Sequence, residues 1–163
     1  MKLGMLLSDI PTADVYQLHR EPPDWRWQEH PDGFEYAVVE PDSFDGAPAL
    51  NVSLSVTVIN DRISEVLKEP DSVWMMTIEH PNNDFLKSRL QLQMFRQEFR
   101  KLLNRMKAKH REASVIHLFP TVPLSVAVEI GRVWMPKADL PIRVYEQNRK
   151  LGGFAPILDL KQC

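Results

Sequence analysis

The chain has 163 residues, 44% of them hydrophobic, which is enough apolar content to bury one core. Its 20 basic and 22 acidic side chains give a formal charge of −2, which excludes a general polycationic surface for long nucleic acid or for an anionic membrane. The single cysteine, Cys163, excludes an intrachain disulfide, and no Cys/His cluster has the spacing of a zinc site. We therefore expect a cytoplasmic domain without a metal, in which a local pocket for a small anion remains open.

Residues 1–48 are predicted to form an extended arm or an edge element, called the N-terminal arm below. The apolar run at residues 3–7 ends at Ser8 and is too short for a signal peptide or a membrane span. Segments 24–27 and 34–39 are typical of short strands, on which Trp25 and Trp27 would point to one side, as a packing surface or as a ligand cage. Long helices are disfavoured by six prolines: Pro11, Pro22, Pro23, Pro31, Pro41 and Pro48.

Residues 49–58 alternate apolar and polar side chains, which predicts a strand. Ser55 and Thr57 lie on its polar side. They would either bond to the backbone or, at the carboxyl end of a parallel strand, face the ligand crevice of an open α/β sheet. Asn60 or Asp61 is then expected to cap a short helix through Leu67.

Residues 72–79 predict a second buried strand, followed by a loop at 80–84. Asp84 is expected to cap a long helix that reaches about Lys109. One face of this helix is basic and is interpreted as solvated surface. The other face is predicted to pack inward through Leu92, Phe95, Phe99, Leu102, Leu103 and Met106.

Residues 115–134 predict a strand, a tight loop and a helix. Pro120 and Pro123 end the strand, and Pro123 suits an early helical position. Ser125 then lies in the first helical turn, where free N–H groups favour an anion such as phosphate. Ala127 and Gly131 share one helical face and would allow close approach to a sheet or a flat ligand, although plain packing explains the same pattern.

The alternation of strands and helices over residues 49–163 predicts an α/β domain with a Rossmann-like, mostly parallel sheet and flanking helices. Two further short strands are expected at 142–146 and 156–160. The first strand-helix turn lacks Gly-x-Gly-x-x-Gly and no P-loop occurs, so no dinucleotide cofactor is expected. The carboxyl edge of the sheet is the candidate pocket, and it gathers Ser55, Thr57, Asn83, Phe85, Ser88, Arg89, Pro120 and Ser125.

Catalytic motifs are missing from the sequence, so we expect a protein without catalysis of its own. There is no Gly-x-Ser-x-Gly elbow and no His-Glu-x-x-His helix, and the five histidines are scattered. His117 lies in an apolar strand and is expected to be a core residue. His80 is a candidate general base for a phosphodiester, but the sequence offers it no partner.

Several separated segments resemble the carboxyl-terminal part of a SAVED domain and occur in the expected order. They are 117–132 (HLFPTVPLSVAVEIGR), 135–137 (MPK), 144–146 (VYE), 54–58 (LSVTV) and 83–88 (NDFLKS), within residues 50–160. This resemblance implies a sensor of cyclic oligonucleotides in anti-phage systems of the CBASS and type III CRISPR kinds. It also implies two fused CARF-like Rossmann halves joined to an effector. The chain has room for one half, so we expect either a sensor subunit that pairs with a second half or a piece of a longer effector.

The resemblance also implies roles for single residues. Ser55 and Thr57 would meet phosphate or ribose, Ser125 a phosphate, and Asn83 and Phe85 a base. Arg89 and Lys137 would neutralise charge, and Pro120 would border the pocket. The expected function is a sensor that forms a ligand-linked oligomer or activates an effector. The alternatives are a ring nuclease with His80 as base, and a structural subunit that binds protein through the N-terminal arm.

Overall fold

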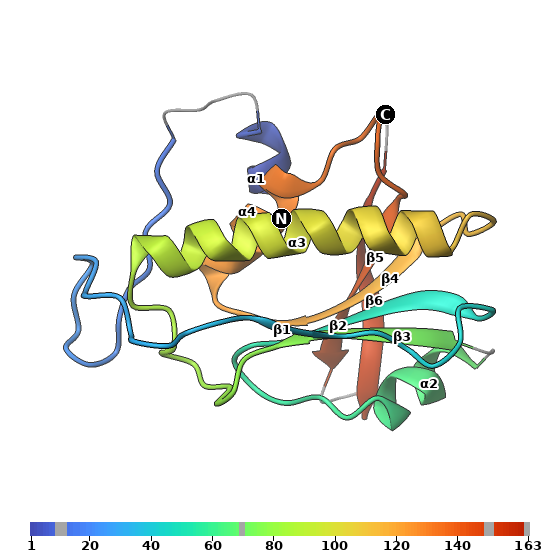
Figure 1. Ribbon diagram of the computed structural model, residues 1–163, viewed down its shortest axis with the longest axis horizontal. Coiled ribbons are helices and arrows are strands. Elements are labelled where there is room, and N and C mark those ends of the chain that lie inside the picture. The colour runs from blue at the N-terminus through green and yellow to red at the C-terminus, as the bar shows by residue number, and fades with distance from the viewer. Residues whose placement is uncertain (9–12, 69–70, 149–151, 162–163) are drawn as a thin grey trace.

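The chain folds into a six-stranded sheet with helices on both faces, as the computed structural model in Figure 1 shows. The structure describes residues 1–8, 13–68, 71–148 and 152–161. The predicted strand 156–160 belongs to a longer strand that begins at Gly153. In chain order the elements are α1 (Lys2–Leu6), β1 (Ala37–Val39), β2 (Ala47–Ser53), α2 (Asp61–Leu67), β3 (Asp71–Thr77), α3 (Arg89–Lys109), β4 (Ile116–Thr121), α4 (Leu124–Val133), β5 (Ile142–Asn148) and β6 (Gly153–Leu160).

The sheet has the strand order β1-β3-β2-β4-β5-β6, and its four inner strands are parallel. The edge strands β1 and β6 run antiparallel to β3 and β5. The prediction of a Rossmann-like, mostly parallel sheet with flanking helices is therefore confirmed, with a mixed sheet as the refinement. Because the four parallel strands end at the same edge, the loops that follow them lie at that carboxyl edge.

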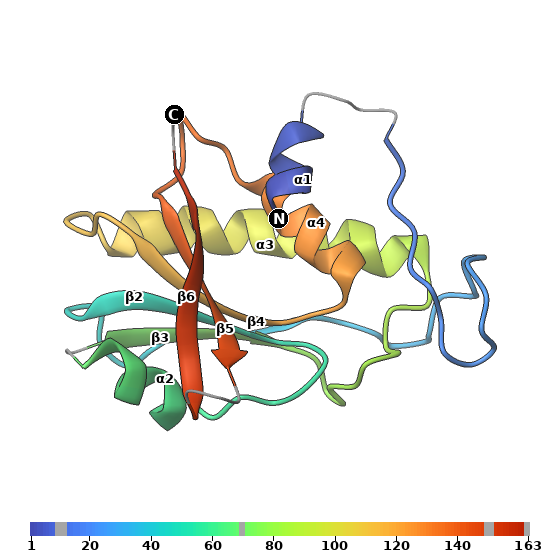
Figure 2. The same ribbon diagram turned by 180° about the vertical axis from the view of Figure 1, so that it is seen from behind.

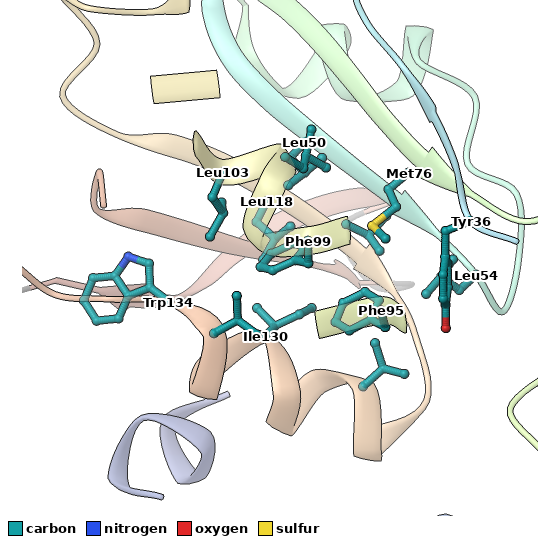
Figure 3. Close-up of a cluster of buried hydrophobic side chains, with 14 of the residues drawn as sticks. Tyr36, Leu50, Leu54, Met76, Phe95, Phe99, Leu103, Leu118, Ile130 and Trp134 are labelled. Carbon is teal, nitrogen blue, oxygen red and sulfur yellow. The ribbon is translucent and has the colours of Figure 1, made fainter. Parts of the chain in front are cut away.

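The larger core lies between the sheet and the layer formed by α3 and α4. All six side chains predicted to face inward from α3 are buried. Figure 3 shows Phe95, Phe99 and Leu103 of this helix against Leu50 and Leu118 of the central strands. Apolar residues spaced three or four apart on the helix thus pack against alternate apolar residues of the strands.

A smaller core lies on the opposite face of the sheet, beneath α2 (Figure 2). It contains Ala49, Val58, Ile63, Phe119, Tyr145 and Phe154. β2 and β4 are therefore covered on both faces, which explains why the polar residues Asn51 and Ser53 of β2 are fully buried. Their side chains bond to each other and to the following loop.

The N-terminal arm contributes an edge strand, β1, as the segment 34–39 predicted. The sequence did not indicate α1, which packs on α4 with almost no side chain between the two backbones. A Cβ added to Gly4 would lie 1.9 Å from the carbonyl oxygen of Val128, and one added to Gly131 would lie 2.0 Å from that of Met1. Gly131 therefore permits close packing of α1 on α4, which agrees with the packing alternative and not with approach to the sheet or a flat ligand.

The tryptophan pair of the arm differs from the prediction. Trp25 is exposed, whereas Trp27 is partly buried and stacks on Tyr16 with ring centroids 6.0 Å apart. Residues 24–27 form no strand, so strand geometry does not align the two rings.

Two predicted boundaries move because polar side chains bond to nearby backbone groups. β2 ends at Ser53, whose Oγ accepts a hydrogen bond from the Val58 amide, so Ser55 and Thr57 lie in a loop and not on a strand. α3 begins at Arg89 with Ser88 as its N-cap, and not at Asp84. Ser88 Oγ accepts from the Gln91 amide, and the Gln91 side chain accepts from the Ser88 amide.

β4 continues through Pro120 to Thr121, although we expected Pro120 to end it. Thr121 turns its carbonyl towards β2, where it accepts hydrogen bonds from Leu54 and Ser55. Pro120, one residue earlier, therefore has its nitrogen on the side of β5. The pairing with β5 ends at Leu118, so no ladder hydrogen bond is lost.

Candidate functional site

The loop between β2 and α2, residues 54–60, is fixed to the end of β4 at the carboxyl edge. The Leu54 and Ser55 amides donate to the Thr121 carbonyl at 3.1 and 2.7 Å, and Thr121 Oγ1 donates to the Val56 carbonyl at 2.7 Å. On the other side of β2, Thr77 Oγ1 donates to the Ser53 carbonyl at 2.9 Å. These contacts hold the loop in place between β3 and β4.

Polar groups of this loop remain available for a ligand. Ser55 is half-buried and Thr57 is exposed, and neither hydroxyl has a hydrogen-bond partner among residues 1–8, 13–68, 71–148 and 152–161. Within the same ranges, the Val56 and Thr57 amides also lack an acceptor. Hydroxyl and amide groups with no internal partner at a sheet edge are suited to phosphate or ribose oxygens.

The loop between β3 and α3 forms an aromatic wall with the N-terminal arm. Phe85 is buried and its ring is stacked parallel to that of Phe34, with centroids 6.1 Å apart. Asn83 is exposed two residues before Phe85. Sequence reasoning missed Phe34, because nothing local relates the arm to residue 85.

A cavity of about 540 Å³ lies beside this aromatic pair. Besides Phe34 and Phe85, three carboxylate residues line it, namely Asp32, Glu35 and Glu79. Other lining residues are Pro31, Gly33, Ala37, Ile78, His80, Asn82 and Gln91. No lysine or arginine contributes to the wall, so the cavity is acidic and disfavours phosphate.

Asp84 ties the arm to the same loop. Its carboxylate accepts hydrogen bonds from the Arg20 and Glu21 amides and from Lys87 Nζ. Burial acts to raise the pKa of Asp84, but these donors outweigh it, and the pKa lies below its usual value. The carboxylate predicted to cap α3 therefore fastens the arm instead.

Two predicted site residues at the start of α3 are engaged within the protein. Ser88 caps the helix and its Oγ lies 2.9 Å from His30 Nδ1 of the arm. Arg89 is exposed and forms an ion pair with Asp14 at 3.4 Å. Arg89 remains open to solvent, whereas Ser88 is buried.

The N-terminal arm covers the first turn of α4. Ser125 lies there as predicted, but it is only 2% exposed, and its Oγ donates to Gln17 Oε1 at 2.7 Å. The phosphate position predicted at this helix end is occupied by an arm side chain in this structure.

Lys137 is not gathered with the other predicted residues. It lies in the connection after α4, beside the carboxyl-terminal half of α3, where Arg100 pairs with Asp139 and Lys107 donates to the Ala138 carbonyl. α4 runs back from the carboxyl edge, so this connection lies at the opposite edge of the sheet.

His80 and His117, the two histidines considered from the sequence, lie in different surroundings. His80 is exposed, and its Nε2 lies 3.8 Å from Glu79 Oε1. His117 is buried, as expected of a core residue, with Nδ1 2.9 Å from the Tyr145 hydroxyl. In the part of the chain that the structure describes, no His, Cys, Asp and Glu cluster could hold a metal ion.

A second cavity, of about 650 Å³, lies at the amino edge of the strands. Its wall includes Phe44, Lys109, His110 and His117. Burial lowers the pKa of His110, only partly opposed by the carbonyls of Gly46 and Phe44, and Trp74 Nε1 donates to its Nε2 at 3.0 Å. This hydrogen bond requires an unprotonated Nε2.

An open, mostly parallel sheet whose carboxyl edge carries polar loops and an aromatic cavity defines an α/β ligand-binding domain. A sequence model of the SAVED family, described as the SMODS-associated and fused to various effectors sensor domain, matches residues 1–160. The chain therefore belongs to the SAVED family. Among the described residues, no helix is long and apolar enough to cross a membrane.

Solved structures of Acinetobacter baumannii Cap4, a receptor containing a SAVED/CARF domain, share the fold. The complexes with the cyclic trinucleotides 2′3′3′-cAAA and 3′3′3′-cAAA each give a TM-score of 0.57 and 18% identity, covering 83% of this chain and 29% of Cap4. A structure described without a trinucleotide gives 0.55 and 15%, covering 79% and 26%. The chain thus spans less than a third of Cap4. No curated protein matches its sequence.

Proposed function

We propose that this chain is a sensor domain that binds a cyclic oligonucleotide at the carboxyl edge of its sheet, in bacterial anti-phage defence. The observation that carries the proposal is the β2–α2 loop, which offers hydroxyl and amide groups without internal partners at the ligand edge of a SAVED domain. The cyclic trinucleotides in the two Cap4 complexes support this class of ligand.

The two halves of the edge suit different parts of such a ligand. Ser55, Thr57 and the loop amides suit phosphate and ribose oxygens. The acidic cavity beside Phe34 and Phe85 suits a base, because an aromatic ring stacks on a base and carboxylates accept hydrogen bonds from exocyclic amino groups. Because the carboxylates of this cavity would repel phosphates, they would orient the cyclic oligonucleotide with its bases towards the cavity.

The sensor has no catalytic activity of its own in this proposal and transmits binding to an effector or to a second SAVED half. A ring with several phosphates can bridge two protomers, and its preference for the assembled state then drives assembly. We expect a ligand-linked increase in mass.

The test is calorimetric titration with cyclic di-, tri- and tetranucleotides, with light scattering on the same samples. Thr57→Glu places a negative charge on the exposed β2–α2 loop and is expected to weaken binding at least about tenfold, as a like charge near phosphate would. Ser114→Glu adds the same charge at an exposed position of the amino edge and serves as the matched control. Equal binding by the two variants would contradict the assignment of the site.

Chromatography of the ring after prolonged incubation tests the absence of catalysis. We expect the cyclic oligonucleotide to remain intact, because His80 is exposed and, among the described residues, forms an ion pair with Glu79 alone. Linear product that disappears in His80→Ala would establish a ring nuclease instead. If no ring binds to the wild-type chain, alone or with a second half, the sensor proposal fails.

A further inference from the structure

Arg62, in the first turn of α2, is held over an aromatic ring at the carboxyl edge. Its guanidinium carbon lies 5.4 Å from the centroid of the Phe154 ring. Phe154 is the second residue of β6 and pairs with Gln147 near the end of β5. The guanidinium therefore lies beside the end of β5. Figure 2 shows α2 next to the first part of β6.

Arg62 differs from most arginines of the chain in having no carboxylate partner. Within the described ranges it forms no ion pair and donates no side-chain hydrogen bond. Ion pairs do hold Arg26, Arg89, Arg96, Arg100, Arg105, Arg132 and Arg143. A guanidinium without an anion keeps its planar set of N–H donors free for one.

The ring beneath Arg62 is rigidly packed. Phe154 is buried and meets the Phe119 ring edge-on at 5.2 Å, and Phe119 stacks on Tyr145 at 4.5 Å. A cation over such a ring keeps its N–H edge free while its position is restricted. The entropy lost when it captures an anion is correspondingly smaller.

The β2–α2 loop carries further donors beside the same hydrophobic cluster. Val58 is buried in one cluster with Phe154, so its neighbours Thr57 and Ile59 lie at the surface beside this cluster. The Thr57 hydroxyl and the Thr57 and Ile59 amides have no partners within the described residues.

We infer that Arg62, seated on Phe154, binds a phosphodiester group together with the β2–α2 loop. This inference rests on the proposed function, because the phosphodiester is taken to belong to the cyclic oligonucleotide. The acidic cavity on the β3 side supports this orientation, since Asp32, Glu35 and Glu79 repel phosphate from there. Arg62 thus fixes which side of the edge receives the backbone of the ring.

The first test needs no cyclic ligand. The wild-type chain is titrated with dimethyl phosphate, a phosphodiester monoanion, and the arginine Nε–H signals are followed by NMR. We expect a saturable shift of the Arg62 signal. Arg143 is the matched control, because Asp159 already holds it at 2.9 and 3.3 Å. An Arg62 signal that moves no more than that of Arg143 overturns the inference, whichever ring the protein binds.

The second test uses the rings. Arg62→Ala is expected to weaken the binding of every cyclic oligonucleotide that the wild type binds, by about tenfold or more. The factor should be the same whatever the bases, because the contact is to phosphate. Arg62→Lys should recover part of the affinity. Lys109→Ala removes a second cation–aromatic pair, which Lys109 forms with Phe44 at the amino edge, and this variant should bind like the wild type.

The outcomes of the two tests are separable. Wild-type affinity in Arg62→Ala, with its circular dichroism unchanged, overturns the inference and leaves the sensor proposal standing. Absence of ring binding by the wild type overturns the sensor proposal, and the dimethyl phosphate titration still decides on Arg62.

Discussion

Replacing Glu129 by glutamine tests the ion-pair group that joins α3, α4 and the N-terminal arm. The Glu129 side chain is 0% exposed, and its two oxygens lie 3.4 Å from Arg96 Nη1 and 3.2 Å from Arg132 Nη1. Arg132 Nη1 also donates to the carbonyl of Ala13 in the arm. The carboxylate is therefore fully desolvated and depends on both arginines.

The expected cost follows from what each arginine loses in Glu129→Gln. Removing one partner of a buried ion pair costs roughly 3–5 kcal/mol, because the remaining charge is left without compensation. Arg96 is 35% exposed and can return to water, whereas Arg132 is 13% exposed and retains only neutral acceptors. We therefore expect the low end, about 3 kcal/mol, which corresponds to a fall in Tm of about 6–12 °C for a domain of this size.

The assay is urea unfolding, with the midpoint compared at constant m. Glu40→Gln is the control, because the Glu40–Arg105 pair has a similar contact at 2.9 Å but both side chains are well exposed. This control should lose about 1 kcal/mol or less. If the two variants lose the same free energy of unfolding, burial does not govern these ion pairs and the reasoning is refuted.

Three further predictions concern stability. Burial holds the pKa of His110 below 6.5, so the stability that its neutral form provides is complete above pH 6.5 and decreases as the pH falls below that value. Thermal unfolding at several pH values should show this decrease in the wild type but not in His110→Gln, whose side chain still offers an acceptor to Trp74. Ser88→Ala removes the N-cap of α3 and should lower the free energy of unfolding in urea by about 1–2 kcal/mol. A decrease equal to that of a surface serine variant would contradict the capping role. Gly4→Ala forces a Cβ against the α4 backbone, so limited proteolysis should release residues of α1 from the variant and not from the wild type. Equal resistance of the two proteins to the protease would refute the close contact.

The sequence was sufficient to predict an element when the spacing of its own apolar residues marks its buried face. The apolar positions of α3 from Leu92 to Met106 predicted its buried face, and the alternation from Ala49 predicted the strand that the structure shows as β2. The order of strands and helices then predicted the parallel sheet and the edge at which a ligand would bind. The candidate pocket follows from this topology alone.

The remaining features depend on contacts between distant residues. Ser125 lies where the sequence placed it, but its contact with Gln17 spans 108 residues and has no local signal. Phe34 reaches Phe85 because β1, which follows Phe34, pairs antiparallel with β3, which precedes Phe85. Asp84 was predicted to cap α3, but its carboxylate binds backbone amides of the arm, and Ser88 is the N-cap instead.

The fastening of the N-terminal arm has a consequence for the order of folding. Its contacts with Asp84, Ser88, Ser125 and Arg132 span 64, 58, 108 and 119 residues. The contact with Ser88 needs the start of α3, and those with Ser125 and Arg132 need α4. Contacts this remote in sequence require closure of large loops, which slows their formation and gives little return until the rest of the core exists. The arm is therefore expected to dock last, on a sheet and helices that are already assembled. Its residues then both form the aromatic wall of the ligand edge and cover the first turn of α4, so the edge is completed in the final step of folding.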